Sequence, residues 1–370
     1  MSPTRFRIGV DGRAFASPAG GVRRYVSELY GAIARAADAV EVIAIGAPEG
    51  AALPPNTHVR AATAFPTNLG WMAASLPLAV RGAALDVFHA PAYTAPLWGV
   101  HPQALTIHDV SYERRPEWNA YRNDRFRRAF YRRSALAADR VITDSAFSRD
   151  EIVAAYGLPA ERIAVVPLAA SAVFAPGPFD AGRAPAGVTA PYVLHVGDLH
   201  VRRNLRTAID AVIDLRARDG VALRLICAGV DRGIGAELRA AAAADPDALV
   251  LTGPVGEDAL LNLYRGALML VYPSMYEGFG LPVLEAMQCG VPVAAANAAS
   301  LPEVTGDGGL LLDPLDARAW RDAIAAVSHD AATRARLRDA GLAQAARFSW
   351  ARTAGETLAV LRQCAAEGRR

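Results

Sequence analysis

The sequence predicts an α/β protein of two doubly wound domains, each a parallel sheet covered by helices on both faces. Short runs that are apolar on both faces, such as VEVIAIG at 40–46 and YVLHVG at 192–197, alternate with longer helical stretches. Hydrophobic residues make up 52% of the 370 residues, which is enough for two cores. A segment rich in Pro and Gly, 171–191, divides the two alternating halves.

Each element follows from this alternation in order along the chain. The first half predicts strands at 6–11, 40–46, 85–90, 104–109, 140–144 and 163–167, with helices at 21–38, 121–138 and 146–157. The second half predicts strands at 192–197, 223–229, 248–253, 268–274 and 291–297, with helices at 203–218, 234–244, 256–266 and 282–289. Further helical stretches follow at 316–328, 331–346 and 350–366. We therefore expect domains over 1–170 and 192–348, a linker over 171–191, and a C-terminal helix in 349–370 that packs back on the first domain.

Composition excludes several classes of enzyme. All 39 residues counted as Lys or Arg are arginine, so the chain contains no lysine. A Walker A loop, a protein kinase and a pyridoxal enzyme each depend on a lysine, and the sequence is none of these. A formal net charge of +2 gives no overall field that would attract nucleic acid, and no nucleic-acid partner is expected.

Cysteine, histidine and hydropathy patterns indicate a cytoplasmic protein without a metal or cofactor. Cys227, Cys289 and Cys364 are scattered, which is typical of neither a disulfide framework nor a zinc site. The seven histidines show no metal-ligand spacing, and the Asp-Pro-Asp triplet at 245–247 lies in a loop that leads into a strand rather than out of one. The N-terminus lacks the apolar stretch of a signal peptide, and the most apolar region, 85–107, is broken by prolines.

The strongest candidate site follows the predicted strand 268–274. The loop from Glu277 to Gly280 leads to Pro282, which occupies the position that Pro favours at a helix start. Glycines there let backbone N–H groups approach an anion. Glu285 lies one turn into the helix among apolar residues, where an unpaired charge would be costly. The E-x7-E spacing could place one carboxylate on a ribose and the other on a second polar ring; the alternative is a glycine-rich turn with a surface glutamate.

Two other segments place candidate residues directly after a predicted strand. Gly197 ends the strand YVLHVG, and Arg202 and Arg203 precede Asn204 at a helix start. Two guanidiniums at that point could clamp a diphosphate, although an ordinary charged loop has the same pattern. Gly21 and the glycine before it open the first helix and could admit a phosphate or an acceptor group, or serve only as a turn. The dinucleotide fingerprint G-x-G-x-x-G is absent from this strand.

Two features of the first half have both a structural and a functional interpretation. His108 and Asp109 end the predicted strand ALTIHD, where a histidine is as often part of the core as catalytic. Residues 114–133 carry eight arginines with aromatic residues between them, and helical spacing places Phe126 and Phe130 on one face. This segment is either an amphipathic helix with a solvated face or a basic edge that touches anionic lipid head groups or a lipid diphosphate.

Taken together, these segments resemble the family 4 glycosyltransferases, a retaining family with the GT-B fold of two facing Rossmann-like domains and a cleft between them. The matching segments run in order along nearly the whole chain: GGVRRY (20–25), HD (108–109), TDSAFSRDEI (143–152), VVPLA (165–169), GDLHVRRN (197–204), EGFGLPVLE (277–285), SLPEV (300–304) and FSW (348–350). HDVSY, SLPEV and FSW look most like mannosyltransferase-type members that use GDP-mannose to build bacterial surface polysaccharide such as lipopolysaccharide.

The resemblance implies roles for individual residues. Glu277 would lie beside the donor sugar, Glu285 would bind the nucleotide ribose, and Arg202 and Arg203 would hold the diphosphate with backbone N–H groups at Gly280 and Leu281. The implied catalytic residues are His108, Arg202, Arg203 and Glu277. The implied substrate-binding residues are Gly21, which would lie at the phosphates and acceptor, and Asp109, Gly197, Asn204, Gly278, Phe279, Gly280, Leu281 and Glu285.

The resemblance also implies that 1–170 is the acceptor domain and 192–348 the nucleotide-sugar donor domain, and it implies the partners of the reaction. The donor would be a nucleotide sugar, with GDP-mannose the best match, and the acceptor a glycan or a polyprenyl-linked glycan at the inner face of the membrane. Two arginines and a helix N-terminus could stabilise the leaving diphosphate without a metal ion. The family usually has Arg-Lys-Asn where this chain has Arg202-Arg203-Asn204, and often a small residue where Arg23 stands.

Two other functions share this architecture. A nucleotide-sugar epimerase would place different acids and histidines in the cleft and matches EGFGLPVLE less well. A non-catalytic sugar-binding protein of the periplasmic type would need an export signal or an attached DNA-binding segment, and neither is visible in the sequence.

Overall fold

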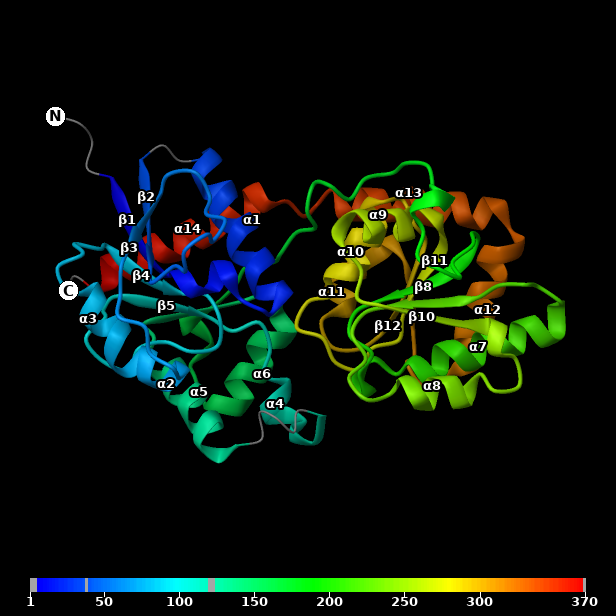
Figure 1. The fold of residues 1–370 in the computed structure, drawn as a ribbon, viewed down its shortest axis with the longest axis horizontal. Helices are drawn as coiled ribbons and strands as arrows, with labels where there is room; N and C mark the ends of the chain where they lie inside the picture. Colours follow the sequence, from blue (N-terminus) through cyan, green and yellow to red (C-terminus); the bar gives the residue numbers. More distant parts are fainter. Residues whose placement is uncertain (1–4, 37–38, 119–123, 369–370) are drawn as a thin grey trace. The chain divides into compact units, whose positions relative to one another are not determined.

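The computed structural model describes residues 5–36, 39–118 and 124–368, and its contacts divide the chain into two compact units (Figure 1). Unit 1 comprises Met1–Leu168 together with Ser349–Arg370. Unit 2 comprises Ala169–Phe348. In each unit the described strands form a parallel sheet, and helices connect them.

Unit 1 is built on a seven-stranded sheet in the order β3-β2-β1-β4-β5-β6-β7. Its strands are β1 (Phe6–Asp11), β2 (Val40–Ile45), β3 (Thr57–Arg60), β4 (Val87–Ala90), β5 (Gln103–Thr106), β6 (Arg140–Thr143) and β7 (Ile163–Val165). Its helices are α1 (Gly20–Ala36), α2 (Asn68–Gly70), α3 (Leu76–Val80), α4 (Ser111–Arg114), α5 (Arg125–Ala137), α6 (Ala146–Tyr156) and α14 (Trp350–Glu367). The C-terminal α14, red in Figure 1, packs on α1 and contacts β4, β5 and β6.

Unit 2 is built on a six-stranded sheet in the order β10-β9-β8-β11-β12-β13. Its strands are β8 (Tyr192–Val196), β9 (Leu225–Ala228), β10 (Leu249–Gly253), β11 (Ala267–Tyr272), β12 (Val293–Ala296) and β13 (Leu310–Leu312). Its helices are α7 (Leu205–Asp219), α8 (Gly235–Ala241), α9 (Glu257–Gly266), α10 (Leu281–Gln288), α11 (Leu301–Thr305), α12 (Ala317–His329) and α13 (Ala331–Ala345). Helix α7 packs on α8 and α12, whereas α10 packs on α11 and α13.

The order of strands reverses once in each sheet. In unit 1 the first strand pairs with β2 on one side and β4 on the other, and in unit 2 β8 pairs with β9 and β11. Open parallel sheets bind ligands at the carboxyl ends of the strands beside such a reversal. The predicted α/β class with two doubly wound parallel sheets is confirmed, and the two reversals are the places where function is expected.

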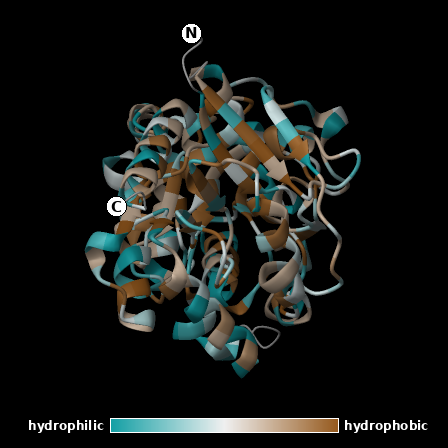
Figure 2. Ribbon diagram, turned by 90° about the vertical axis from the view of Figure 1, so that its left-hand side faces the viewer, coloured by the Kyte–Doolittle hydropathy of each residue, from teal (hydrophilic) through white to brown (hydrophobic). Residues whose placement is uncertain are grey.

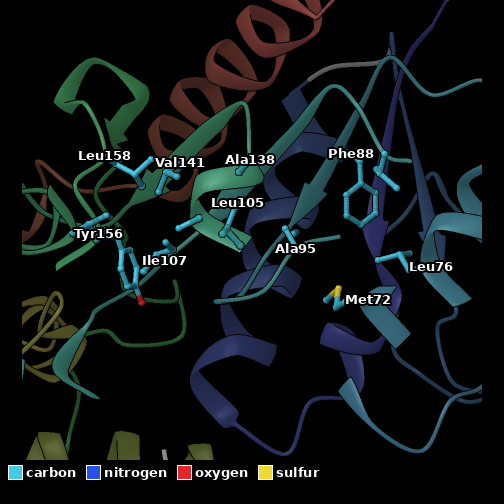
Figure 3. Close-up of a cluster of buried hydrophobic side chains, with 14 of the residues drawn as sticks. Met72, Leu76, Phe88, Ala95, Leu105, Ile107, Ala138, Val141, Tyr156 and Leu158 are labelled. Atoms are coloured by element: carbon cyan, nitrogen blue, oxygen red, sulfur yellow. The ribbon is translucent and has the colours of Figure 1, made fainter. Parts of the chain in front are cut away.

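Apolar side chains from strands and helices form the cores. Coloured by hydropathy, the interior strands are mostly brown, and hydrophilic residues gather on the outer helices (Figure 2). In unit 1, one buried cluster extends from Tyr156 of α6 through Leu105 and Val141 of neighbouring strands to Met72 and Leu76 of the helical segment before β4 (Figure 3). This core holds the carboxyl ends of the central strands in place.

The structure adds elements that the sequence pattern did not predict. Strands β3 and β13 are the outer strands of their sheets and are only four and three residues long, so neither has the long apolar run of a central strand. The helical segment Asn68–Val80 was also not predicted. Of the predicted helices, residues 37–38 and 121–123 lie outside the described residues.

The segment 171–191 is part of unit 2. Phe174 is fully buried with its ring 5.6 Å from that of Tyr264, and the Asp180 N–H donates to Asn262 Oδ1 at 2.8 Å. Phe179 also contacts the Tyr192 ring, and the Gln288 side chain donates to the carbonyl oxygens of Ser171 and Phe174, so ring contacts and hydrogen bonds hold this segment rich in Pro and Gly. The proline and glycine content of 171–191 indicated that its backbone is irregular, but it gave no information about which residues the segment contacts.

Candidate active site

In unit 2, a buried arginine lies at the carboxyl end of β8. Arg203 is the last residue of a short 3-10 turn, Val201–Arg203, and Asn204 follows it in the left-handed conformation at φ 50° before α7 begins. The Arg203 side chain is only 10% exposed. Burial lowers the pKa of this guanidinium, which nevertheless stays charged at neutral pH. A charge in such a position requires partners.

The partners of Arg203 come from the strand beside β8. Its Nη1 donates to Tyr272 Oη, to Ser274 Oγ at 3.3 Å and to Glu277 Oε1, and its guanidinium lies 5.1 Å from the centre of the Tyr272 ring. Glu277 is 6% exposed, and its second oxygen lies 4.0 Å from Nη2 of Arg202. One carboxylate therefore faces two guanidiniums, and the three side chains together keep one positive charge.

The loop that carries Glu277 is held from behind. Ser300 Oγ is fully buried and contacts the carbonyl oxygens of Glu277 at 2.9 Å and Phe279 at 2.8 Å. Gly280 then adopts φ 115°, a conformation that favours glycine, and α10 begins at Leu281 with Pro282 in its first turn. The predicted start of this helix is confirmed. Gly278, with its neighbours, thus lies in a loop that ends at a helix N-terminus.

Glu285 is buried inside α10 and is paired, as its apolar neighbours require. It is 2% exposed, and it accepts a hydrogen bond of 2.8 Å from the Tyr264 hydroxyl of α9. The carboxylate, after burial itself, raises the pKa of Tyr264 well above its ordinary value of 10, which keeps this phenol a donor. The structure therefore excludes the alternative of a surface glutamate at this position.

Two predicted binding residues of unit 2 shape the backbone around Arg203. Gly197 has φ 129°, and a Cβ on it would lie 3.3 Å from the Arg203 guanidinium, so glycine leaves room for that side chain. The Asn204 side chain donates to the Pro314 carbonyl and accepts from Thr207. Asn204 therefore ends the 3-10 turn and directly precedes the first residue of α7.

In unit 1, the predicted site residue His108 is paired with a buried carboxylate. His108 follows β5 and Asp144 follows the neighbouring β6, and Nδ1 of the histidine lies 2.8 Å from Oδ2 of Asp144. Burial opposes the charged imidazole, but Asp144 outweighs it and holds the pKa of His108 above its ordinary 6.5. His108 Nε2 is buried as well, and a hydrogen bond with the backbone of Pro91 helps to raise the pKa of this histidine.

The remaining predicted residues of unit 1 have different surroundings. Asp109 Oδ1 accepts from the backbone N–H and the hydroxyl of Ser111, the first residue of α4. Gly21 lies in the exposed first turn of α1, and a Cβ there would meet nothing within 4 Å. Packing in unit 1 alone therefore gives no reason for a glycine at this position.

Several site residues had no sequence signal of their own. Tyr272 and Ser274 lie at the end of the apolar strand β11, and only their place after a central strand indicated them. Asp144 lies inside TDSAFSRDEI, a segment that the resemblance used without naming a role for it. Among the described residues, no group of three or more His, Cys, Asp or Glu side chains is placed to hold a metal ion. Asp245 of the Asp-Pro-Asp triplet instead pairs with Arg216 at 2.6 Å.

Comparison with known proteins identifies the family. Residues 19–170 match the family model Glycosyltransferase Family 4, and residues 190–330 match Glycosyl transferases group 1. The O-antigen chain mannosyltransferase B of Escherichia coli is 33% identical over 294 residues, which cover 74% of this chain and 73% of that protein. The chain belongs to this family of glycosyltransferases. It is therefore a transferase, as predicted.

Two further comparisons show how far the likeness extends. A D-inositol 3-phosphate glycosyltransferase of Acidothermus cellulolyticus is 35% identical over 249 residues, which are 63% of this chain and 55% of that protein. The chain thus spans little more than half the length of this relative. The structure of sucrose-phosphate synthase from Thermosynechococcus elongatus matches with a TM-score of 0.76 and 22% identity, over 98% of this chain and 100% of that one. The predicted GT-B fold is confirmed by this likeness.

The His108–Asp144 pair predicts a pH dependence of stability. A raised pKa means that the stabilisation by this pair is present in full below the ordinary pH 6.5 and is lost as pH rises through the raised pKa. In Asp144→Asn, burial dominates and the pKa of His108 falls below 6.5. The difference in free energy of unfolding between the two proteins is therefore expected to shrink as pH rises through the raised pKa of His108. Urea unfolding and an NMR titration of the His108 ring measure both quantities.

The control is Asp219→Asn, which removes the carboxylate from an exposed pair with His329, 3.2 Å apart. Exposed pairs contribute little, so this variant should show a small and nearly flat difference over the same range. A His108 ring that titrates below pH 6.5 in the wild type, or a difference that grows with pH, contradicts the assignment.

Proposed function

We propose that the chain transfers mannose, with retention of configuration, from GDP-mannose to a glycan or polyprenyl-linked glycan acceptor during synthesis of a bacterial surface polysaccharide. The function of the O-antigen relative supports the choice of mannose. The observation that carries the proposal is the arrangement of Arg202, Arg203 and Glu277 at the carboxyl ends of β8 and β11. We place the reaction in the cytoplasm.

The charges at this position suit a nucleoside diphosphate. Two guanidiniums and one carboxylate leave a net positive charge, and guanidiniums bind phosphate oxygens through two parallel hydrogen bonds. Helix α10 begins at Leu281, and the dipole at its N-terminus favours an anion, although Pro282 has no N–H and the Val283 N–H donates to the Gly280 carbonyl oxygen. The charge that develops on the leaving diphosphate is greatest in the transition state, so these groups assist bond breaking more than ground-state binding.

The proposed reaction is a displacement on one face of the sugar. The bond between sugar C1 and the diphosphate oxygen breaks while the acceptor hydroxyl oxygen forms a new bond to C1 from the same side. The leaving phosphate oxygen takes the proton of that hydroxyl, and Arg202 and Arg203 stabilise the negative charge that remains. Glu277 positions Arg203 and faces the donor sugar. We place His108 near the transferred sugar, as the family resemblance implies.

We also propose that the donor is held without a metal ion, because two arginines are present where a cation would otherwise be needed. GDP affinity measured by calorimetry should therefore be the same within about threefold with EDTA and with added Mg²⁺. Guanosine, which lacks the diphosphate, is the control and should bind much more weakly. A loss of more than about tenfold on chelation contradicts the proposal.

Glu285 is proposed to bind the nucleotide ribose. Glu285→Ala should weaken GDP binding by about 1.5–3 kcal/mol, because a hydrogen bond to a charged acceptor is lost, and Glu285→Gln should weaken it less. Tyr264→Phe is the matched control, since it removes the hydrogen bond that Glu285 accepts inside unit 2 and keeps the carboxylate. Unchanged GDP affinity in a folded Glu285→Ala protein, or an equal loss in Tyr264→Phe, shows that the carboxylate is only structural.

Helix α5 is proposed to touch an anionic membrane surface. Phe126 is 88% exposed, and Arg125, Arg132 and Arg133 on the same helix are exposed as well. Arg128 is different, because it donates to Glu113 at 2.8 Å. An apolar ring among unburied arginines suits the interface of a bilayer with anionic head groups. Within the described residues, no helix is both long and apolar enough to cross a membrane. Arg122 and Tyr121 of the predicted arginine-rich segment lie outside the described residues.

Liposomes with anionic lipid should bind the protein at low salt and release it as salt rises, because each basic residue near such a surface contributes about 1 kcal/mol and salt screens it. Reversal of Arg125, Arg132 and Arg133 to Glu should abolish sedimentation with the liposomes. Slow hydrolysis of GDP-mannose in solution should persist.

The matched control reverses three exposed arginines of unit 2, Arg239, Arg336 and Arg338, and changes the net charge by the same amount. Equal loss of binding in both variants would indicate an effect of net charge alone. No association at low ionic strength would show that α5 does not bind membranes and would favour a soluble acceptor.

A further inference from the structure

Unit 1 contains a cavity of about 460 Å³ that no residue of the predicted site lines. It opens beside the carboxyl ends of β1 and β4, where the strand order of this sheet reverses. Its size is within the range of ~300–1,000 Å³ that is usual for small-molecule sites. Met72, drawn in Figure 3, lines the cavity and also belongs to the unit 1 core, so the cavity has a rigid floor.

The charged groups of the cavity cancel each other. Among its lining residues the only formal charges are those of Asp11 and Arg13. Arg13 Nε donates to Asp11 Oδ1 at 3.0 Å and Nη2 donates to Oδ2 at 2.7 Å, which is a two-pronged pair. Asp11 is 5% exposed. A phosphate in this cavity would meet an arginine already neutralised and a buried carboxylate beside it, and like charges at short distance repel.

The same groups are well arranged for hydroxyls. Arg13 Nη2 also donates to Asn68 Oδ1 at 3.0 Å, and Asn68 Nδ2 donates to Thr94 Oγ1 at 3.2 Å. The guanidinium lies 4.4 Å from the centre of the Trp71 ring, which holds its plane. A chain of carboxylate, guanidinium, amide and hydroxyl presents both donors and acceptors at fixed positions. Neighbouring hydroxyls on a sugar ring need this mixture.

An aromatic wall joins the cavity to His108. Tyr93 and Tyr131 both line the cavity, with ring centres 6.4 Å apart. The Tyr93 ring also lies 5.9 Å from that of His108, nearly edge to face. Tyr93 has φ 59°, which a residue other than glycine seldom adopts and which the surrounding structure must impose. Tyr93 therefore connects the wall of the cavity to the ring of His108.

We propose that this cavity binds the acceptor as an uncharged sugar ring and discriminates against phosphorylated acceptors, with the Asp11–Arg13 pair as the determinant of that specificity. The inference rests on the proposed glycosyltransferase reaction and adds the chemical class of its acceptor. Asp11 accepts from ring hydroxyls, the free Arg13 and Thr94 donors bind ring oxygens, and the tyrosines contact the apolar face of the sugar.

The test compares an uncharged probe with a phosphorylated one, methyl α-mannoside and mannose 6-phosphate, by calorimetry or saturation-transfer NMR on the full chain. The wild type should bind the uncharged probe at least about tenfold more tightly. Asp11→Asn keeps the size of the side chain but frees the charge of Arg13. This variant should bind methyl α-mannoside more weakly and mannose 6-phosphate more tightly, which reverses the preference.

Two further variants keep the test decisive. Ala16→Trp fills the cavity from an exposed position, so it should weaken binding of methyl α-mannoside without unfolding the protein even if Asp11→Asn is unstable. Glu41→Gln breaks an ion pair with Arg7 in the same sheet, outside the cavity, and should leave the preference unchanged. Equal binding of both probes by the wild type, or a preference that Asp11→Asn and Ala16→Trp leave intact, overturns the inference while GDP binding by the wild type still supports the transferase. Absence of GDP binding overturns the reaction on which it rests.

Discussion

A buried arginine is stable at the end of a central strand only if a negatively charged group forms an ion pair with it there. Arg203 at the end of β8 meets Glu277 after β11, and the other features of the unit 2 site follow from this ion pair. Gly197 leaves space for the guanidinium, Asn204 takes the left-handed conformation that ends the turn, and Ser300 holds the Glu277 loop from behind. Replacement of one partner would leave the other charged and buried, which is costly. The pair is therefore a structural requirement before any substrate arrives.

The parallel sheet explains why these residues meet. Strands that run in one direction bring all their carboxyl ends to one edge, so residues more than 70 positions apart become neighbours without a special connection. Unit 1 repeats this arrangement, since His108 and Asp144 follow the neighbouring strands β5 and β6. In both units an ionisable side chain is buried beside an opposite charge. Preorganised groups of this kind stabilise developing charge without reorganisation during the reaction, which suits the Arg203–Glu277 pair to a leaving diphosphate.

The strands that could be predicted from the sequence are those that are buried on both faces of a sheet. Central strands such as β8 and β11 are continuous apolar runs, and the residues that follow them were candidates for that reason. The outer strand β3 is partly exposed and has no such run. The carboxylate at 285 had to be paired, but its partner Tyr264 comes from a different helix and no spacing rule connects the two. The unit 1 cavity was missed because Asn68 and Trp71 lie in short helical turns without a hydrophobic period.

The central claim is that Arg203 holds the donor diphosphate while Glu277 holds Arg203. Calorimetry of GDP with Arg203→Gln, Glu277→Gln and the double variant tests it, with Arg216→Gln as a control that breaks the Arg216–Asp245 pair of the same unit. The account predicts that Arg203→Gln weakens GDP binding by about 1.5–3 kcal/mol, and that Glu277→Gln also weakens it, because Arg203 loses the carboxylate that holds it. The double variant should bind GDP no more weakly than Arg203→Gln alone, and Arg216→Gln should have no effect. Losses that add up in the double variant, or unchanged affinity in Arg203→Gln, would contradict it.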